Sequence, residues 1–194
     1  RALAVYEHVP EEQIYCANGA SEIIFRLALA LKPKKALVLA PTFADYEKAL
    51  RTVGCEIDYY MLAADQEFSL QEDFLHKLDE GFDIVWICNP NNPTGQGCER
   101  PFMERVLERC RRMQTLVMVD ECFMGFVDEP EKYSVQPLIG SHNHLLVLKA
   151  FTKLFAIPGI RLGYVRTGVY PSWLKKPGYV LCSRENISKS PRLW

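Results

Sequence analysis

Residues 84–95 read IVWICNPNNPTG. The first part, Ile84–Cys88, is continuously apolar, which is typical of a strand buried on both faces of a parallel sheet. The second part is a turn in which two prolines and a glycine restrict the backbone, so the side chain of Asn92 is presented in one orientation. Because loops held by a rigid scaffold often carry functional residues, this stretch predicts a buried strand that delivers a polar side chain to a site.

Strand-like and helix-like segments alternate along the rest of the chain. The expected strands are Ile14–Ala17, Ala36–Ala40, Glu56–Met61, Ile84–Cys88, Thr115–Val119 and Leu145–Leu148. The expected helices are Ser21–Leu31, Thr42 to near Gly54, Ser69 to about Leu78, and Pro101–Arg112. Ser69 and Glu72 have the spacing of a capping box, which predicts a helix start at Ser69. This order predicts an α/β fold, a three-layer α/β/α domain with a mostly parallel sheet.

The composition is that of an ordinary globular protein, with 194 residues, 48% of them hydrophobic, and a net charge of -1. This charge gives no reason to expect nucleic acid or an anionic membrane as a partner. No apolar run approaches the ~20 residues that span a bilayer. The seven cysteines include no Cys-x-x-Cys pair, so we expect no metal site, and an odd thiol count favours a reducing cytoplasm.

Residues 148–164 read LKAFTKLFAIPGIRLGY and follow an apolar strand. They place Lys153 beside the hydroxyl of Thr152 and, after a turn of small residues, near Arg161. An amine in this setting can condense with an aldehyde, while the hydroxyl and the guanidinium bind a phosphate. Taken alone, the stretch fits solvated surface charges equally well, because lysine and arginine are mostly exposed.

Two other loops follow predicted strands. The turn at Gly19, Ala20 and Ser21 leads into a helix, whose free N–H groups and positive dipole end favour a phosphate. The alternative is that Ser21 only caps this helix, which is the commoner role of such a serine. Phe43 can stack on a flat heteroaromatic ring, although core packing is the commoner fate of phenylalanine.

Asp120 ends the apolar run of the fifth predicted strand. A carboxylate there would pair with a protonated ring nitrogen, keep it protonated and make the ring a better electron sink. A helix cap or an ion-paired strand end is an equally good reading of Asp120 alone. Ligands of doubly wound sheets bind at the carboxyl ends of the strands, so these loops are expected to meet. Together they supply what pyridoxal 5'-phosphate needs.

This set of motifs resembles the fold-type-I, class I and II aminotransferase superfamily of pyridoxal-phosphate enzymes. The similarity runs from about Ile14 to Tyr164. It implies that Lys153 forms the Schiff base and moves protons, and that Asp120 binds the pyridine nitrogen. It also implies that Asn92 binds the ring oxygen and that Phe43 stacks on the ring. The implied phosphate ligands are Gly19, Ala20, Ser21, Thr152 and Arg161.

Within the superfamily the chain looks most like threonine-phosphate decarboxylases of cobalamin biosynthesis. The pieces that carry this likeness are residues 31–35, 43–46, 54–57, 99–101, 120–123, 152–153 and 155–159. The related histidinol-phosphate aminotransferases usually have a tyrosine where Phe123 stands, and some relatives have a phosphate-binding hydroxyl where Ala150 stands. The implied reaction is decarboxylation of O-phospho-L-threonine to aminopropanol phosphate. The alternatives are a histidinol-phosphate type of aminotransferase and an inactive remnant that only binds cofactor.

The resemblance also implies a cytoplasmic homodimer whose active sites are shared across the interface. We expect residues 1–166 to form the large cofactor-binding domain, incomplete at its N-terminus, and residues 167–194 to be a tail without a family match. On this expectation the small C-terminal domain is missing and the chain is a fragment. Plain nucleotide binding is a weaker reading, since neither a P-loop nor a Gly-x-Gly-x-x-Gly motif occurs.

Overall fold

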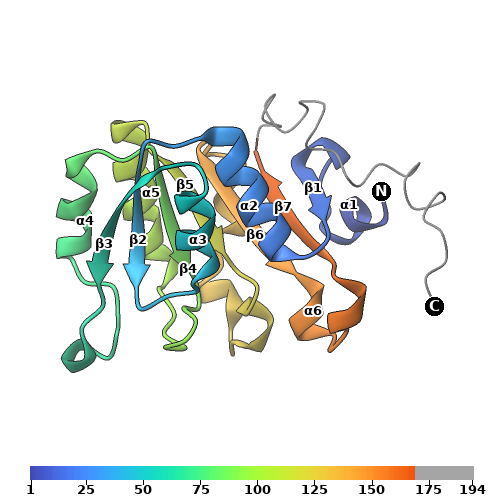
Figure 1. The fold of residues 1–194 in the computed structure, drawn as a ribbon. Helices are drawn as coiled ribbons and strands as arrows, with labels where there is room; N and C mark the ends of the chain where they lie inside the picture. Colours follow the sequence, from blue (N-terminus) through green and yellow to red (C-terminus); the bar gives the residue numbers. More distant parts are fainter. Residues whose placement is uncertain (169–194) are drawn as a thin grey trace.

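The computed structural model of the protein describes residues 1–168, and Figure 1 shows them as a sheet covered by helices on both faces. The strands are β1 (Ile14–Ala17), β2 (Lys35–Ala40), β3 (Glu56–Met61), β4 (Ile84–Cys88), β5 (Leu116–Asp120), β6 (Leu145–Ala150) and β7 (Gly163–Thr167). The helices are α1 (Ala2–Tyr6), α2 (Ala20–Leu31), α3 (Asp45–Arg51), α4 (Asp73–Lys77), α5 (Arg100–Met113) and α6 (Phe151–Leu154). The predicted α/β fold is confirmed.

The described strands form one sheet in the order β1-β7-β6-β5-β4-β2-β3. Only β7 runs antiparallel to its neighbours in this part of the chain, and all other pairs are parallel. The sequence analysis did not predict β7, because this five-residue strand opens with Gly163 and ends with the polar Arg166 and Thr167. Its central residues, Tyr164 and Val165, are nevertheless fully buried.

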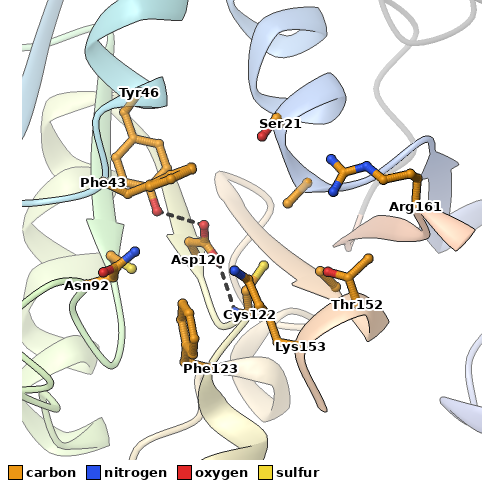
Figure 2. Close-up of a pocket in the computed structure, with 13 residues that line it drawn as sticks. Ser21, Phe43, Tyr46, Asn92, Asp120, Cys122, Phe123, Thr152, Lys153 and Arg161 are labelled. Atoms are coloured by element: carbon orange, nitrogen blue, oxygen red, sulfur yellow. Dashed lines mark hydrogen bonds between the residues drawn. The ribbon is translucent and has the colours of Figure 1, made fainter. Parts of the chain in front are cut away.

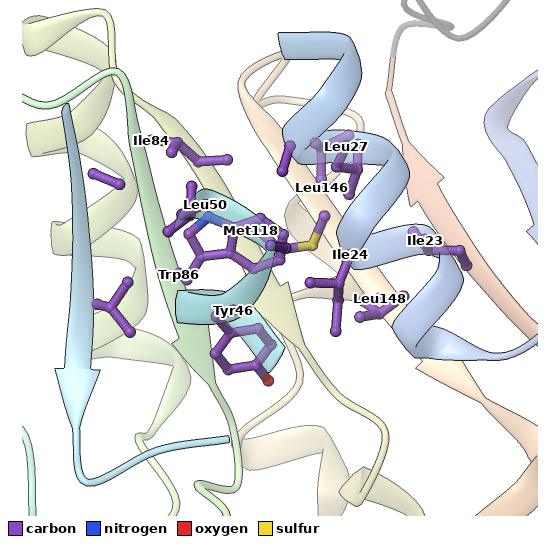
Figure 3. Close-up of a cluster of buried hydrophobic side chains, with 14 of the residues drawn as sticks. Ile23, Ile24, Leu27, Tyr46, Leu50, Ile84, Trp86, Met118, Leu146 and Leu148 are labelled. Atoms are coloured by element: carbon purple, nitrogen blue, oxygen red, sulfur yellow. The ribbon is translucent and has the colours of Figure 1, made fainter. Parts of the chain in front are cut away.

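Two apolar cores lie on the two faces of the sheet. Successive side chains of a strand point to opposite faces, so Ala36 and Val38 of β2 pack with α2 and α3, whereas Leu37 and Leu39 pack with α4 and α5. Figure 3 shows the first core, in which the ring of Trp86 stacks on that of Tyr46 with centroids 5.2 Å apart. Burial on both faces explains the continuous apolar runs of the central strands.

The helix predicted to start at Ser69 begins four residues later, so this prediction was wrong. Glu72 does not reach back to the N–H of Ser69, as a capping box requires. The Glu72 carboxylate accepts hydrogen bonds from Arg105 on α5 instead, and the Ser69 N–H donates to the carbonyl of Gln66 at 3.0 Å. A tertiary ion pair thus replaces the local cap, and α4 starts at Asp73.

The carboxyl ends of β2, β4, β5 and β6 meet at one edge, since these strands are parallel. β1 also ends there, because it is antiparallel to β7, which is in turn antiparallel to β6. The loops that follow these five strands therefore surround one point in space.

Candidate functional site

A pocket opens where these loops converge (Figure 2). Its lining residues are Ala20, Ser21, Phe43, Tyr46, Cys88, Asn92, Asp120, Cys122, Phe123, Ala150, Thr152, Lys153 and Arg161. Eight of the nine residues that the sequence analysis selected are among them. The ninth, Gly19, lies behind the guanidinium of Arg161.

The N-terminus of α2 forms one end of the pocket. Gly19 is the N-cap residue with φ +92°, and no side chain among the described residues caps the helix. A Cβ atom at Gly19 would lie 2.7 Å from Nη2 of Arg161, so only glycine lets the guanidinium approach this closely. Uncapped N–H groups, an arginine and the hydroxyl-bearing Ser21 and Thr152 lie together here, and these are groups of the kind that bind anions.

Ser21 does not cap α2, so that alternative reading was wrong. Its hydroxyl donates to Oδ2 of Asp45 at 2.8 Å, across to the start of α3. Glu22, in the first turn of α2, accepts a hydrogen bond at 2.6 Å from the backbone N–H of Asn18, the residue before the N-cap. The Glu22 carboxylate also accepts a hydrogen bond from the buried side chain of Arg26, which donates to the hydroxyl of Tyr15 as well.

Gly163, at the start of β7, packs against the turn at Gly19 and Ala20. A Cβ atom there would lie 2.6 Å from the backbone nitrogen of Ala20 and 2.6 Å from the carbonyl carbon of Gly19. The turn therefore rests directly on the backbone of β7. This contact joins the turn before α2, at one end of the pocket, to β7, the strand that follows Arg161.

Asp120 occupies the other end of the pocket. Its carboxylate is 5% exposed and accepts hydrogen bonds from the Tyr46 hydroxyl at 2.7 Å and from the Cys122 N–H at 2.9 Å (Figure 2). Burial raises the pKa of this carboxyl above its usual value, while hydrogen bonds from Cys122 and Tyr46 and the charge of Lys153 act in the opposite sense. Neutral donors satisfy its oxygens, but no cation touches them within residues 1–168.

Tyr46 was not predicted as a site residue. On sequence it is one apolar residue of a helix, and its ring does stack in the core on Trp86. Burial raises the pKa of its hydroxyl well above the ordinary value, so the group remains a proton donor toward Asp120. No local signal in the sequence marks Tyr46, because its bond to Asp120 joins residues 74 apart in the chain.

The loop at residues 89–95 is tied down by two other asparagines. Asn91 is 5% exposed; its amide donates to the carbonyl of Pro41 at 3.0 Å, and its oxygen accepts from Thr42 at 2.8 Å. Asn89 is fully buried and bonds to the backbone of Cys98. With both neighbours engaged in structure, Asn92 is the asparagine of this loop that faces the pocket.

Lys153 lies on α6, directly after β6, and its side chain is exposed at the pocket mouth. Its Nζ is 5.3 Å from the centroid of the Phe123 ring. Figure 2 shows the amine directed toward the side of the pocket that holds Asp120, opposite Phe43. An amine, a buried carboxylate and the start of α2 with Arg161 therefore surround one space.

A family model described as aminotransferase class I and II matches residues 2–169. The chain belongs to this family. Enzymes of the class I and II aminotransferase family depend on pyridoxal 5'-phosphate, so the predicted family and cofactor are confirmed.

Individual relatives carry two kinds of name. A threonine-phosphate decarboxylase from Salmonella typhimurium is 38% identical over 165 residues, covering 85% of this chain and 45% of that protein. A histidinol-phosphate aminotransferase from Listeria welshimeri is 31% identical over 167 residues, covering 84% and 45%. The crystal structure of the histidinol-phosphate aminotransferase from Clostridium acetobutylicum matches with a TM-score of 0.78 at 32% identity, covering 87% and 49%. The chain spans less than half the length of these relatives.

The remaining expectations concern other kinds of site. Within residues 1–168 no group of three or more His, Cys, Asp or Glu side chains is arranged to hold a metal ion. No helix of this part of the chain is long and apolar enough to cross a membrane. Of the expected tail at residues 167–194, Thr167 ends β7, and everything from residue 169 lies outside the described residues.

Replacing Gly163 with alanine should destabilise the protein, because the new methyl group would collide with the backbone of Ala20. Overpacking of this kind costs about 1–3 kcal/mol in the free energy of unfolding. Gly140→Ala is the matched control, since no atom lies within 4 Å of a Cβ at that position. Urea denaturation of both variants tests the contact, and equal stabilities would refute it.

The burial of Asp120 predicts a pH dependence of stability in the cofactor-free protein. Its folded-state pKa is raised, so above about pH 4, where an unfolded aspartate loses its proton, the folded state binds more protons than the unfolded state. Stability from this group is therefore complete at low pH and falls as pH rises. The free energy of unfolding of the wild type, minus that of Asp120→Asn, should decrease between pH 4 and pH 8.

Urea denaturation at a series of pH values measures this difference. Glu121, whose carboxyl pKa is also raised by burial, is present in both proteins and cancels. A difference that stays constant or grows with pH would contradict the burial argument.

Proposed function

We propose that this chain forms the cofactor-binding part of a pyridoxal-phosphate-dependent lyase that decarboxylates O-phospho-L-threonine to aminopropanol phosphate. The observation that carries the proposal is the 38% identity to a threonine-phosphate decarboxylase over nearly the whole described chain, with Phe123 and Lys153 in contact at the pocket. The wider statement, that the chain belongs to a family of pyridoxal-phosphate enzymes, stands apart from this finer assignment.

The residues present fit the cofactor. Asp120 is a buried carboxylate that, within residues 1–168, has neutral donors and no cation in contact, and a ring N–H⁺ would offset its burial. Gly19 leaves the space through which Arg161 reaches the uncapped end of α2. Phe43 lines the same pocket, beside Tyr46 (Figure 2). One phosphorylated aromatic aldehyde with a protonated ring nitrogen would offer a partner to each of these groups.

When bound, pyridoxal 5'-phosphate supplies an aldehyde that condenses with amines and a ring that accepts the electrons of a broken Cα bond. Asp120 would hold the proton of the ring nitrogen, and Asn92 would bind the ring oxygen. Phe43 would pack on the ring face and exclude water. Lys153 would supply the amine that anchors the cofactor.

At the other end of the pocket, Arg161 would pair with the phosphate, and the hydroxyls of Ser21 and Thr152 would donate to it. The first N–H groups of α2, at Ala20 and Ser21, would add the dipole of the helix.

Lys153 would also complete the reaction. Decarboxylation breaks the bond between Cα and the carboxylate, carbon dioxide leaves, and the carbon then needs a proton. The Lys153 ammonium would donate that proton to Cα. Its neighbour Phe123 has no hydroxyl, so one hydrogen bond that a tyrosine offers to the ring oxygen is absent here.

We further propose that the whole enzyme is a cytoplasmic homodimer acting on a small phosphorylated amino acid. Support for the substrate class comes from the names of the relatives, which act on threonine phosphate or histidinol phosphate. Support for the dimer and the compartment is the family resemblance.

The second candidate is an aminotransferase of the histidinol-phosphate type, favoured by the structural match at a TM-score of 0.78. Carbon dioxide release from O-phospho-L-threonine and amino transfer from histidinol phosphate to 2-oxoglutarate separate the two. We expect the whole protein to release carbon dioxide and Lys153→Ala to be slower by a factor of at least about 100, the usual contribution of a positioned proton-transfer group.

The matched control is Lys132→Ala, a lysine that pairs with Glu129 on the surface and does not line the pocket. It should leave the rate unchanged. Amino transfer without carbon dioxide release would overturn the decarboxylase assignment. Absence of both reactions in a folded, cofactor-loaded protein would favour an inactive remnant.

A further inference from the structure

The hydroxyl of Ser21 is committed to a partner that no part of the proposed reaction uses. It lies at the end of the pocket formed by Arg161 and the start of α2 (Figure 2), and it donates to Oδ2 of Asp45 at 2.8 Å. A hydroxyl carries one proton and can donate it to one acceptor at a time. Ser21 therefore cannot donate to Asp45 and to a bound phosphate together.

Among the described residues, the cation that pairs with Asp45 is Lys48. Asp45 is the first residue of α3, and its side chain is 19% exposed. Its other oxygen lies 3.4 Å from Nζ of Lys48, whose side chain is 66% exposed and thus well solvated. Exposed ion pairs of this kind contribute little to stability. Lys48 therefore offsets the charge of the Asp45 carboxylate only weakly, and this negative charge acts on the neighbouring pocket.

A phosphate bound between Arg161 and the start of α2 would bring further negative charge to this carboxylate. Two effects then act in the same direction, since like charges repel and the Ser21 proton is shared between two acceptors. We propose that Asp45 competes with the phosphate of the ligand for the Ser21 hydroxyl and so limits the affinity of the pocket for phosphate monoesters. This inference rests on the proposed function, because it takes the ligand phosphate to lie at this end.

The consequence is that the Ser21 hydroxyl stays bonded to Asp45 in the cofactor-free protein. This hydrogen bond must break before Ser21 can donate to an entering phosphate. A ligand of the same shape without a phosphate leaves the contact between Ser21 and Asp45 intact. Asp45 thus acts on the phosphate alone and not on the ring.

The test compares dissociation constants of pyridoxal 5'-phosphate and of pyridoxal, which lacks the phosphate, for the whole protein and its variants. We expect Asp45→Asn to bind pyridoxal 5'-phosphate about fivefold more tightly, the size expected for one partly screened charge pair, and to bind pyridoxal with unchanged affinity. Absorbance titration measures both constants.

Glu47→Gln is the matched control. It removes the same charge from the same helix, at a residue that pairs with Arg51 at 2.7 Å and does not line the pocket. Its constants should equal those of the wild type. A second substitution, Asp45→Ser, removes the charge in a residue suited to a helix start and should match Asp45→Asn, which covers a failure of either one to fold.

An unchanged or weakened affinity of Asp45→Asn for pyridoxal 5'-phosphate would overturn the inference and would make Asp45 a residue that orients Ser21. Equal tightening by Glu47→Gln would also overturn it, because the effect would then be one of net charge. Borohydride reduction followed by peptide mass spectrometry tests the cofactor site independently of the role of Asp45. An adduct on Lys153 without tighter binding refutes only the role of Asp45, whereas no adduct on Lys153 refutes the cofactor site.

Discussion

The burial of one carboxylate that no cation of the described residues touches is the constraint on which the rest of the site depends. Asp120 lies at the end of the central strand β5, where burial opposes its ionised form. The Tyr46 hydroxyl and the Cys122 N–H hold it in place but bring no charge. A cationic partner would offset the burial of this carboxylate, and Asp120 lines a pocket in which one can reach it. The family's cofactor carries such a group in its ring.

The fold meets this constraint with loops that are fixed by contacts outside the pocket. Asn91 joins the loop of Phe43 to the loop of Asn92 through Thr42 and Pro41. At the other end, the backbone of Gly163 supports the turn before α2. Several side chains that face the pocket also have partners in the fold: Tyr46 donates to Asp120 and stacks on Trp86, and Ser21 donates to Asp45. Because Ser21 is one of the proposed phosphate-binding residues, its contact with Asp45 has consequences for binding.

Much of the fold and of the candidate site was predictable from short sequence patterns. Continuous apolar runs such as Ile84–Cys88 predict parallel strands, and parallel strands bring their following loops together. Contacts between distant residues were not predictable. The bond from Tyr46 to Asp120 spans 74 residues, and it depends on a helix register that no short pattern encodes. Glu72 failed as a capping residue because Arg105, far along the chain, offered a stronger partner.

The central claim is that Asp120 holds a protonated ring nitrogen in the pocket faced by Lys153. The ¹⁵N chemical shift of pyridoxal 5'-phosphate labelled at its ring nitrogen and bound to the protein tests it most directly. The account predicts the shift of a protonated nitrogen in the wild type at neutral pH and that of an unprotonated nitrogen in Asp120→Asn. An unprotonated nitrogen in the wild type, or a protonated one that persists in the variant, would contradict it.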